Sequence, residues 1–327
     1  MDEQIKSSIT KAEQVLPAEL IKRLQMQLEP SAYSNSLQSF DEPKPVTIRP
    51  NTLRSSETEL LTQIANVGME TKPVDWCPEC HLLTKGTIRQ LQELPISESG
   101  GMYIQAASSM LAAYALQTEP GMRVLDMCAA PGSKTSLLAS IMNNEGMLVA
   151  NDRSRKRLYR LREILQWQGA TNVEVLCGPG ERLAQTHGDC FDRVLVDAPC
   201  SGEGRIRLDK PIRINRWNIQ EIRTLAKLQE QLLVAALRCV VVGGMVVYST
   251  CTFAPEENEC VLNKVLSRNS IDAEIVEIPD ALRPAQAIKP LQEWNEYKIQ
   301  HDISNAMRII PDKTTTGFFV ASLRRLS

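Results

Sequence analysis

The stretch "RVLDMCAAPGSKTSLLASIM", Arg123–Met142, decides the fold. Its first five residues predict a buried strand, small residues form a turn, and the apolar spacing from Lys134 onward indicates a helix. Strand, tight turn and helix in this order make up the first part of a β-α-β unit. A turn of Ala, Pro, Gly and Ser also lets a ligand approach the backbone at the positive amino end of the helix.

The same alternation continues along the chain. Strands are predicted at "MLVAND", "VEVLC", "DRVLVDAP" and "MVVYST", and helices at "RKRLYRLREILQWQG" and "IQEIRTLAKLQEQLLVAALRCV". Such alternation predicts an α/β fold in which helices cover both faces of a parallel sheet. Ligands of these sheets bind at the carboxyl ends of the strands.

Two cysteines follow strands in the same way. Cys200 follows the strand in "VLVDAPCSGEG", Val194–Gly204, and Cys251 follows the strand in "MVVYSTCTFAPEEN", Met245–Asn258. A single cysteine in either place is more often a small buried apolar residue. The proline after the second cysteine starts a helical turn, however, and a thiolate is stabilised near a helix amino end. Two thiols in matching positions therefore favour a shared active site.

The turn and the second strand indicate a cofactor. The turn matches neither the dinucleotide nor the triphosphate glycine pattern, and a tight turn without a ligand is the alternative. Asp152 ends the second strand, where an acid commonly accepts the hydroxyl groups of a ribose, although it could equally cap the following helix. Together the two features point to a cofactor that contains adenosine.

The chain is expected to have three parts. Residues 1–39 have leucines at helical spacing and predict a helical extension followed by a linker, which starts near Pro30. Residues 40–105 predict a small α/β module whose helix is capped by Ser55 or Ser56. Residues 106–327 form the large α/β unit.

Composition places the protein in a broad class. The 327 residues have a formal net charge of −2, so any contact with nucleic acid must use local basic patches. Nine scattered cysteines suit free thiols in a reducing, cytoplasmic compartment. No membrane span is expected, and "CPEC", Cys77–Cys80, lacks the second pair of ligands that a zinc site needs. We therefore expect no metal.

The motifs "DMCAAPGSKT", "VANDRS", "VLVDAPCSGEG" and "VVYSTCTFAPEENE", in this order, resemble those of the RNA cytosine-5 methyltransferases of the Nop/Sun type. The resemblance covers roughly residues 45–327, including "IRPNTL", "YIQAASSM" and "TTTGFFVASLRR". Among these enzymes the chain is most similar to the bacterial 16S ribosomal RNA methyltransferase F group, without the long carboxyl-terminal extension of that group. The resemblance implies a Rossmann-like domain that uses S-adenosylmethionine and a small module similar to RNA-recognition folds.

The resemblance also implies roles for individual residues. Cys251 would attack the cytosine ring, Cys200 would assist product release, and Asp197 would hold the cytosine edge next to the cofactor. Pro179 stands where the family usually has an acid that contacts adenine, so adenine recognition would fall to the backbone or to another residue. The cofactor would be bound by Cys128, Ala129, Ala130, Pro131, Gly132, Ser133, Lys134, Asp152, Pro179 and Asp197.

Two basic segments are candidates for binding RNA. "RSRKRLYRLR", Arg153–Arg162, is more typical of a solvated helix face. "GRIRLDKPIRINRW", Gly204–Trp217, directly follows the first cysteine motif and is the better candidate. Its expected phosphate ligands are Arg205, Arg207, Lys210 and Arg213.

The leading hypothesis is an S-adenosylmethionine-dependent methylation of carbon 5 of cytosine in ribosomal or transfer RNA by a monomeric enzyme. The main alternative is a non-catalytic RNA-binding or ribosome-assembly factor that retains the fold. A DNA cytosine methyltransferase would attack with the cysteine of its Pro-Cys motif, and the Ser-Thr-Cys motif argues against that class.

Overall fold

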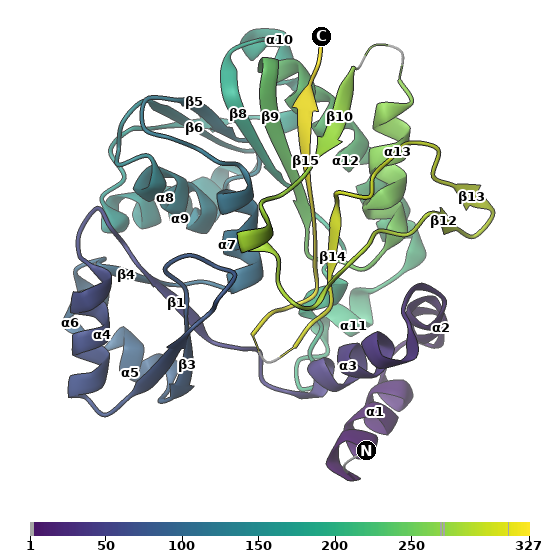
Figure 1. Ribbon diagram of the computed structural model, residues 1–327, viewed down its shortest axis with the longest axis horizontal. Coiled ribbons are helices and arrows are strands. Elements are labelled where there is room, and N and C mark those ends of the chain that lie inside the picture. The colour runs from purple at the N-terminus through teal and green to yellow at the C-terminus, as the bar shows by residue number, and fades with distance from the viewer. Residues whose placement is uncertain (1–2, 269, 271, 313) are drawn as a thin grey trace.

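The computed structural model describes residues 3–268, 270, 272–312 and 314–327. The largest sheet in this part of the chain has nine strands in the order β11-β14-β15-β9-β8-β5-β6-β7, with β10 beside β15 (Figure 1). Its parallel strands are β5 (Arg123–Asp126), β6 (Met147–Asp152), β7 (Val173–Cys177), β8 (Phe191–Asp197) and β9 (Val240–Thr250). The antiparallel strands are β10 (Ala273–Val276), β11 (Ala287–Ile288), β14 (Met307–Ile309) and β15 (Phe318–Arg325).

The predicted α/β fold is confirmed, and the sheet is larger than expected. The closing segment "TTTGFFVASLRR" contains β15, which pairs antiparallel to β9 from Phe319 to Arg324. Its first six residues are all buried, because the sheet continues on both sides of it. The prediction stopped at β9 because alternation of strands and helices identifies only the parallel part of such a sheet.

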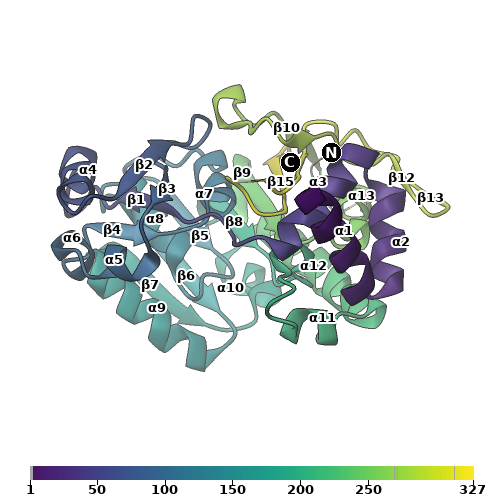
Figure 2. The same cartoon turned by 90° about the horizontal axis from the view of Figure 1, so that it is seen from below.

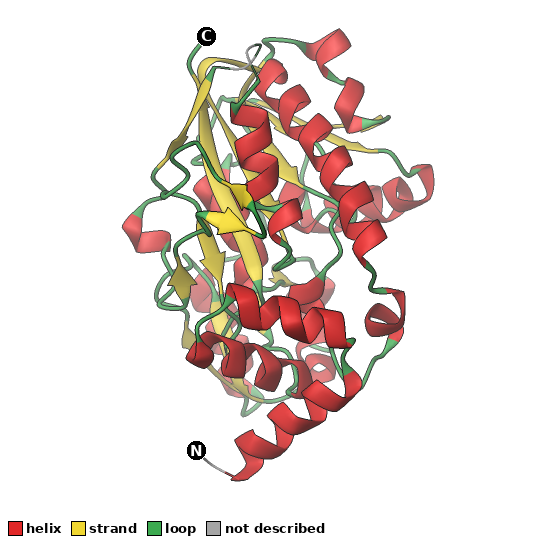
Figure 3. Cartoon of the chain, turned by 90° about the vertical axis from the view of Figure 1, so that its right-hand side faces the viewer, coloured by secondary structure: helices red, strands yellow, loops and turns green. Residues whose placement is uncertain are grey.

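Strand residues alternate between two apolar cores. Val194 and Val196 face a core formed with α12 (Ile219–Cys239) and α13 (Glu259–Leu266). Leu195, between them, faces a core formed with α7 (Ala107–Ala115) and α8 (Ser133–Ile141). This period of two explains the continuous apolar runs of the parallel strands. Figure 3 shows the strands beside the long helices.

Shorter elements complete this unit. α9 (Arg155–Gln168) packs its leucines on the turn after β5 and on β6. The remaining helices and the small hairpin are α10 (Ala184–His187), α11 (Ile212–Arg216), β12 (Glu293–Trp294) and β13 (Tyr297–Lys298). None of the described helices combines the length and the apolar composition needed to cross a membrane.

A small α/β module precedes the large sheet. Its elements are β1 (Thr47–Pro50), α4 (Glu57–Asn66), β2 (Glu70–Pro73), β3 (His81–Lys85), α5 (Ile88–Gln92), α6 (Pro95–Glu98) and β4 (Met102–Ile104). The strand order β2-β3-β1-β4, with all neighbours antiparallel, is the split β-α-β arrangement of RNA-recognition-like folds. Ser56 caps α4, as one of the two predicted serines. Arg49 and Asn51 fasten the module to the large unit through Ser136 and the Gln168 carbonyl.

The chain begins with three helices, α1 (Glu3–Val15), α2 (Ala18–Gln27) and α3 (Pro30–Asp41). The prediction of a linker from about residue 30 is wrong over the length of α3. Pro30 occupies the first turn of that helix, where a proline is tolerated, and the buried Leu37 and Phe40 give it a packed face. These helices share an apolar core with Ile206, Ile214 and Phe253, so they lie against the large unit (Figure 2). The extension is therefore part of the folded body.

Candidate active site

The two cysteines of the strand-end motifs meet at one edge of the sheet. β8 and β9 are adjacent and parallel, with Asp197 opposite Ser249, so the loops that leave them run side by side. The Sγ atoms of Cys200 and Cys251 are 3.1 Å apart, and the Cys251 backbone N–H donates to the Cys200 sulfur at 3.2 Å. All nine cysteines are free thiols. The parallel register of β8 and β9 therefore brings Cys200 and Cys251, which are distant in the sequence, into contact.

The two thiols have opposite pKa shifts. A hydrogen bond from Cys200 lowers the pKa of Cys251 to about 7, and the charges of Arg205 and Arg213 act in the same direction against burial. The hydrogen bond to Cys251, together with burial, raises the pKa of Cys200 well above that of an ordinary thiol. Near neutral pH, Cys251 is therefore the thiol that ionises more readily, and Cys200 keeps its proton. This is the electrostatic arrangement that a nucleophile at Cys251 requires.

Asp197 lies beside the thiol pair with both oxygens engaged. Ser249 Oγ donates to one oxygen at 3.0 Å and Lys134 Nζ to the other at 2.7 Å. Lys134 also donates to Ser109 Oγ at 2.8 Å. Lys134 was expected to bind the cofactor together with the turn after β5, but its ammonium group is directed to Asp197. The ion pair holds Asp197 as an oriented carboxylate.

These groups line a cleft of about 860 Å³. The four basic residues expected to bind RNA form one wall, together with Arg216 and Trp217. Lys44 and Tyr103, which the sequence did not single out, contribute from the amino-terminal side. Of the predicted site residues, those that line the cleft are Pro131, Ser133, Lys134, Asp197, Cys200, Arg205, Arg207, Lys210, Arg213 and Cys251.

The rest of the predicted cofactor residues lie outside that lining. Ala129 N–H donates to the Asn151 carbonyl at 2.8 Å, and Ala130 N–H donates to the Asp152 carboxylate at 3.3 Å. The predicted residues outside the lining are Cys128, Ala129, Ala130, Gly132, Asp152 and Pro179. The turn after β5 therefore has one side on the cleft and the other on the end of β6.

Asp152 performs a local task in this arrangement. Its buried carboxylate accepts from the backbone of Ala130 and Ser154 and pairs with Arg157 at 3.0 Å. The cap of α9 is Ser154, whose side chain accepts from Arg157 N–H, so the capping role considered for Asp152 belongs to its neighbour. Asp152 instead fixes the turn after β5 against the end of β6.

The geometry of this turn fits a polar ligand with an anionic end. Gly132 has φ +117°, and a Cβ there would lie 2.8 Å from Leu161 Cδ1, so only glycine suits the position. No side chain caps α8 after Gly132, which leaves its first-turn N–H groups available to an anion. The buried Asn151 Oδ1 has no partner within the described residues and can accept a hydrogen bond. Pro179 offers no side-chain donor or acceptor of its own.

The "CPEC" segment has a structural place. Cys77 and Cys80 are both buried, and His81 Nε2 is 2.6 Å from Glu57 Oε1. In the part of the chain that the structure describes, no three or more His, Cys, Asp and Glu side chains gather in a way that could hold a metal ion.

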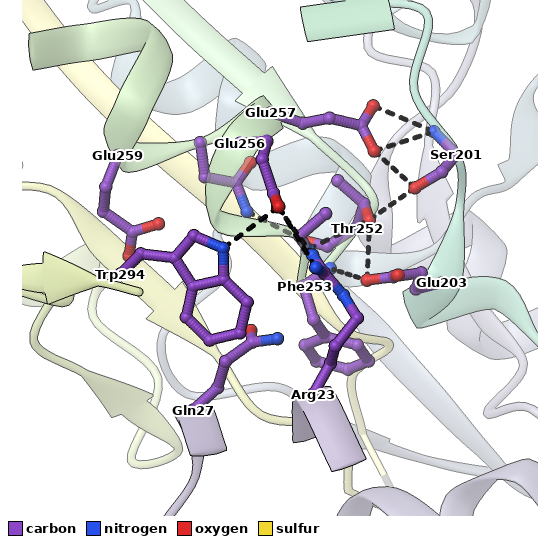
Figure 4. Close-up of polar contacts among 12 residues, drawn as sticks. Arg23, Gln27, Ser201, Glu203, Thr252, Phe253, Glu256, Glu257, Glu259 and Trp294 are labelled. Atoms are coloured by element: carbon purple, nitrogen blue, oxygen red, sulfur yellow. Dashed lines mark hydrogen bonds and ion pairs between the residues drawn. The ribbon is translucent and has the colours of Figure 1, made fainter. Parts of the chain in front are cut away.

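The sequence analysis missed the residues that join the two cysteine loops. Glu203 and Glu257 contact Ser201 and Thr252 between the loops (Figure 4). Both acids stand in the motifs "SGEG" and "APEEN", where they were treated as parts of turns. No spacing indicates that two acids 54 residues apart will meet.

The sheet order, the cofactor turn and the two-cysteine cleft define a Rossmann-like methyltransferase domain. Residues 113–324 match the family described as 16S rRNA methyltransferase RsmB/F, and residues 16–107 match the N-terminal domain of 16S rRNA methyltransferase RsmF. The chain belongs to the RsmB/F family of methyltransferases.

Similar proteins come from all three domains of life. The chain is 37% identical to ribosomal RNA small subunit methyltransferase F of Aeromonas hydrophila, over 85% of this chain and 57% of that protein. It is 34% identical to 26S rRNA (cytosine-C(5))-methyltransferase nsun-1 of Caenorhabditis elegans, over 89% of this chain and 44% of that protein. The chain thus spans about half the length of these relatives.

One solved structure matches from end to end. The crystal structure of a methyltransferase homolog protein from Pyrococcus horikoshii has 32% sequence identity and a TM-score of 0.83. The match covers 98% of this chain and 99% of that chain.

The coupling between the thiols can be measured without a substrate. Replacing Cys200 with alanine removes the hydrogen bond to the Cys251 sulfur, so the pKa of Cys251 should rise. A rise from 7 to 8 lowers the thiolate fraction at pH 7 by about fivefold and leaves it nearly unchanged at pH 10. Mass spectrometry of iodoacetamide alkylation at Cys251 across pH should show this change. Cys190→Ala is the matched control, and an equal midpoint in both variants would contradict the coupling.

Proposed function

We propose that this protein transfers a methyl group from S-adenosylmethionine to carbon 5 of a cytosine in RNA, with ribosomal RNA as the first candidate and transfer RNA as the second. The observation that carries the proposal is the pair of sulfur atoms of Cys200 and Cys251, which lie 3.1 Å apart and line a basic cleft together with Asp197. The names of the rRNA cytosine-C(5) relatives support it.

The cofactor site would lie at the turn after β5 and the end of β6. The backbone from Cys128 to Ser133 would surround the amino acid part, and Asp152 would accept from the ribose. With Pro179 in place of an acid, the adenine would be held by backbone groups or by a neighbour such as Asn151. When bound, S-adenosylmethionine supplies an electrophilic methyl group.

The residues of the chain divide the chemistry. Carbon 5 of cytosine is a poor nucleophile, so the Cys251 thiolate would first form a bond to carbon 6, which makes carbon 5 enamine-like. Asp197 would hold the polar edge of the base. After methylation, removal of the carbon 5 proton returns electrons to the ring and breaks the bond between Cys251 and carbon 6.

The coupling of the two thiols suits Cys200 to that second step. Part of the upward shift in the pKa of Cys200 comes from the hydrogen bond and the charge of Cys251. A Cys251 sulfur bonded to carbon carries no negative charge, so this part of the shift disappears in the adduct. Cys200 can then lose its proton to solvent in the cleft and, as the thiolate, accept the proton from carbon 5. Each cysteine is thus prepared for its step by the state of the other.

The RNA would lie along the basic wall of the cleft. Arg205, Arg207, Lys210 and Arg213 would neutralise phosphates. Lys44 adds a positive group near Arg207, although burial and the charge of Arg207 lower its pKa to about 8.

Three finer points belong to the same proposal. We infer that the protein acts as a monomer in the cytoplasm, where its free cysteines stay reduced. We also propose that its functional parts are the three expected ones, with the first boundary moved from residue 39 to the end of α3 at Asp41: residues 1–41, 42–105 and 106–327. The separate apolar core of the small module supports its independence.

The roles of the cysteines predict different fates for two variants. Cys251→Ala should abolish methyl transfer and form no covalent complex with RNA, because carbon 6 is not attacked. Cys200→Ala should still attack and methylate but release product slowly, so a protein–RNA adduct should persist on denaturing gels. Ribosomal RNA with labelled S-adenosylmethionine is the probe.

The same gels address the alternatives. An adduct in the Cys251 variant and none in the Cys200 variant would reverse the roles, as in DNA cytosine methyltransferases. Absence of adduct and of methylation in every protein, the parent included, would support the non-catalytic RNA-binding factor, for which Pro179 in the cofactor site is the supporting observation.

The basic wall predicts a weaker dependence of RNA binding on salt after mutation. Replacing Arg205, Arg207, Lys210 and Arg213 with alanine should flatten the slope of log affinity against log salt by about 0.7 per lost contact with a single-stranded RNA. Fluorescence anisotropy with a labelled cytosine-rich RNA measures the slope. The matched control loses four exposed charges just before and on α9 (Arg153, Arg155, Lys156 and Arg162), and equal slopes in the two variants would contradict the assignment.

A further inference from the structure

Two buried acids lie between the loops that carry Cys200 and Cys251 (Figure 4). Glu203 is 1% exposed and Glu257 is fully buried. Each carboxyl group has hydroxyl, amide or indole partners. The acids therefore take part in a polar network that reaches both loops.

Glu257, on the loop after β9, reaches across to the other loop. Its Oε2 accepts from Ser201 N–H at 3.0 Å and from Gln229 Nε2 at 2.8 Å. Its Oε1 contacts the Ser201 hydroxyl. The Gln229 amide also donates to the Pro199 carbonyl at 2.7 Å, which ties the same loop to α12.

Glu203, on the loop after β8, reaches across in the opposite direction. Its Oε1 accepts from Trp217 Nε1 at 2.8 Å. Its Oε2 accepts from Phe253 N–H at 3.1 Å and contacts Thr252 Oγ1 at 3.0 Å. The hydroxyl groups of Ser201 and Thr252 are 2.7 Å apart and connect the two acids.

Four oxygens therefore stand in a row: Glu257 Oε1, Ser201 Oγ, Thr252 Oγ1 and Glu203 Oε2. Three hydrogen bonds join them, and each bond needs one hydrogen atom. The two hydroxyl groups supply two hydrogens, so the third must come from one of the carboxyl groups. A row with both acids ionised would leave one close oxygen pair without a hydrogen.

The surroundings place the proton on Glu257. Burial and the charge of Glu203 together raise the pKa of Glu257 to about 8, against the hydrogen bonds from Ser201 and Gln229. Burial also raises the pKa of Glu203, but the hydrogen bond from Trp217 and the charge of Arg23 oppose that effect. The hydrogen bonds then all point from Glu257 through Ser201 and Thr252 to an ionised Glu203.

We propose that Glu203 and Glu257 are positioning residues that share one proton, carried by Glu257, and clamp the two cysteine loops together through Ser201 and Thr252. Ser201 directly follows Cys200 and Thr252 directly follows Cys251. The clamp therefore acts on the residues next to the two sulfurs and holds them at their separation of 3.1 Å. This inference rests on the roles proposed for the two cysteines.

The same substitution at the two acids has opposite expected results. In Glu257→Gln, the amide nitrogen can donate to Ser201 Oγ while the amide oxygen accepts from Ser201 N–H and Gln229. The pH profile of iodoacetamide alkylation at Cys251 should match the parent. In Glu203→Gln, either orientation of the amide faces an N–H or O–H donor, since Trp217 lies on one side and Phe253 with Thr252 on the other. The clamp should then open and weaken the hydrogen bond between the two thiols, so the pKa of Cys251 should rise. A rise of about one unit would lower alkylation at pH 7 by about fivefold and leave it nearly unchanged at pH 10.

Two further variants complete the experiment. Glu257→Ala should lower alkylation at pH 7 as Glu203→Gln does. Glu274→Gln is the control: Glu274 lies on β10 and pairs with Arg324, away from the strand end that leads to Cys251, so its profile should equal that of the parent. Circular dichroism melting verifies that each variant is folded, and the contrast between the glutamine variants remains decisive if the alanine variant does not fold.

Two results would overturn the proposal. A changed profile in Glu257→Gln with a normal one in Glu203→Gln would place the proton on the other acid. Parent-like profiles in Glu203→Gln and in a folded Glu257→Ala would show that the acids do not set the thiol geometry. The assay uses neither RNA nor cofactor, so its failure is distinguishable from a failure of the proposed function.

Discussion

The parallel pairing of β8 with β9 is the constraint on which the site depends. Asp197 lies opposite Ser249 in this pair, and the next few residues of each strand end bring Cys200 into contact with Cys251. The hydrogen bond between the thiols then separates their pKa values, so that Cys251 ionises more readily and Cys200 keeps its proton. A slip of either strand by one residue would reverse which side chains face each core and separate the loops.

All three parts of the chain support this pair of loops. α2 reaches the loop after Cys251 through Arg23, whose two terminal guanidinium nitrogens donate to Glu256. Arg308, in the antiparallel strand β14, donates to the Phe253 carbonyl at 2.7 Å and to Gln27 of α2. From the small module, Tyr103 lines the same cleft as the two cysteines. The amino-terminal helices and the antiparallel strands thus hold the loop that carries Cys251.

Local patterns in the sequence predicted the parallel strands, their helices and the meeting of the two cysteine motifs, because period and strand-end position are visible along the chain. The sequence did not reveal contacts set by packing. The Ser-rich segment from residue 30 is helical because Leu37 and Phe40 are buried against the large unit. Lys134 was expected to bind the cofactor, but its ammonium group pairs with Asp197, which is 63 residues away in the sequence. Glu203 and Glu257 meet only once β8 and β9 are paired.

The central claim is that Cys251 enables methylation of carbon 5 of cytosine in RNA. Bisulfite sequencing of ribosomal and transfer RNA from cells with and without the gene tests it most directly. The account predicts at least one cytosine that is protected only when the gene is present, restored by the parent protein and not by Cys251→Ala. Identical protection at every cytosine in both cell lines would contradict the account.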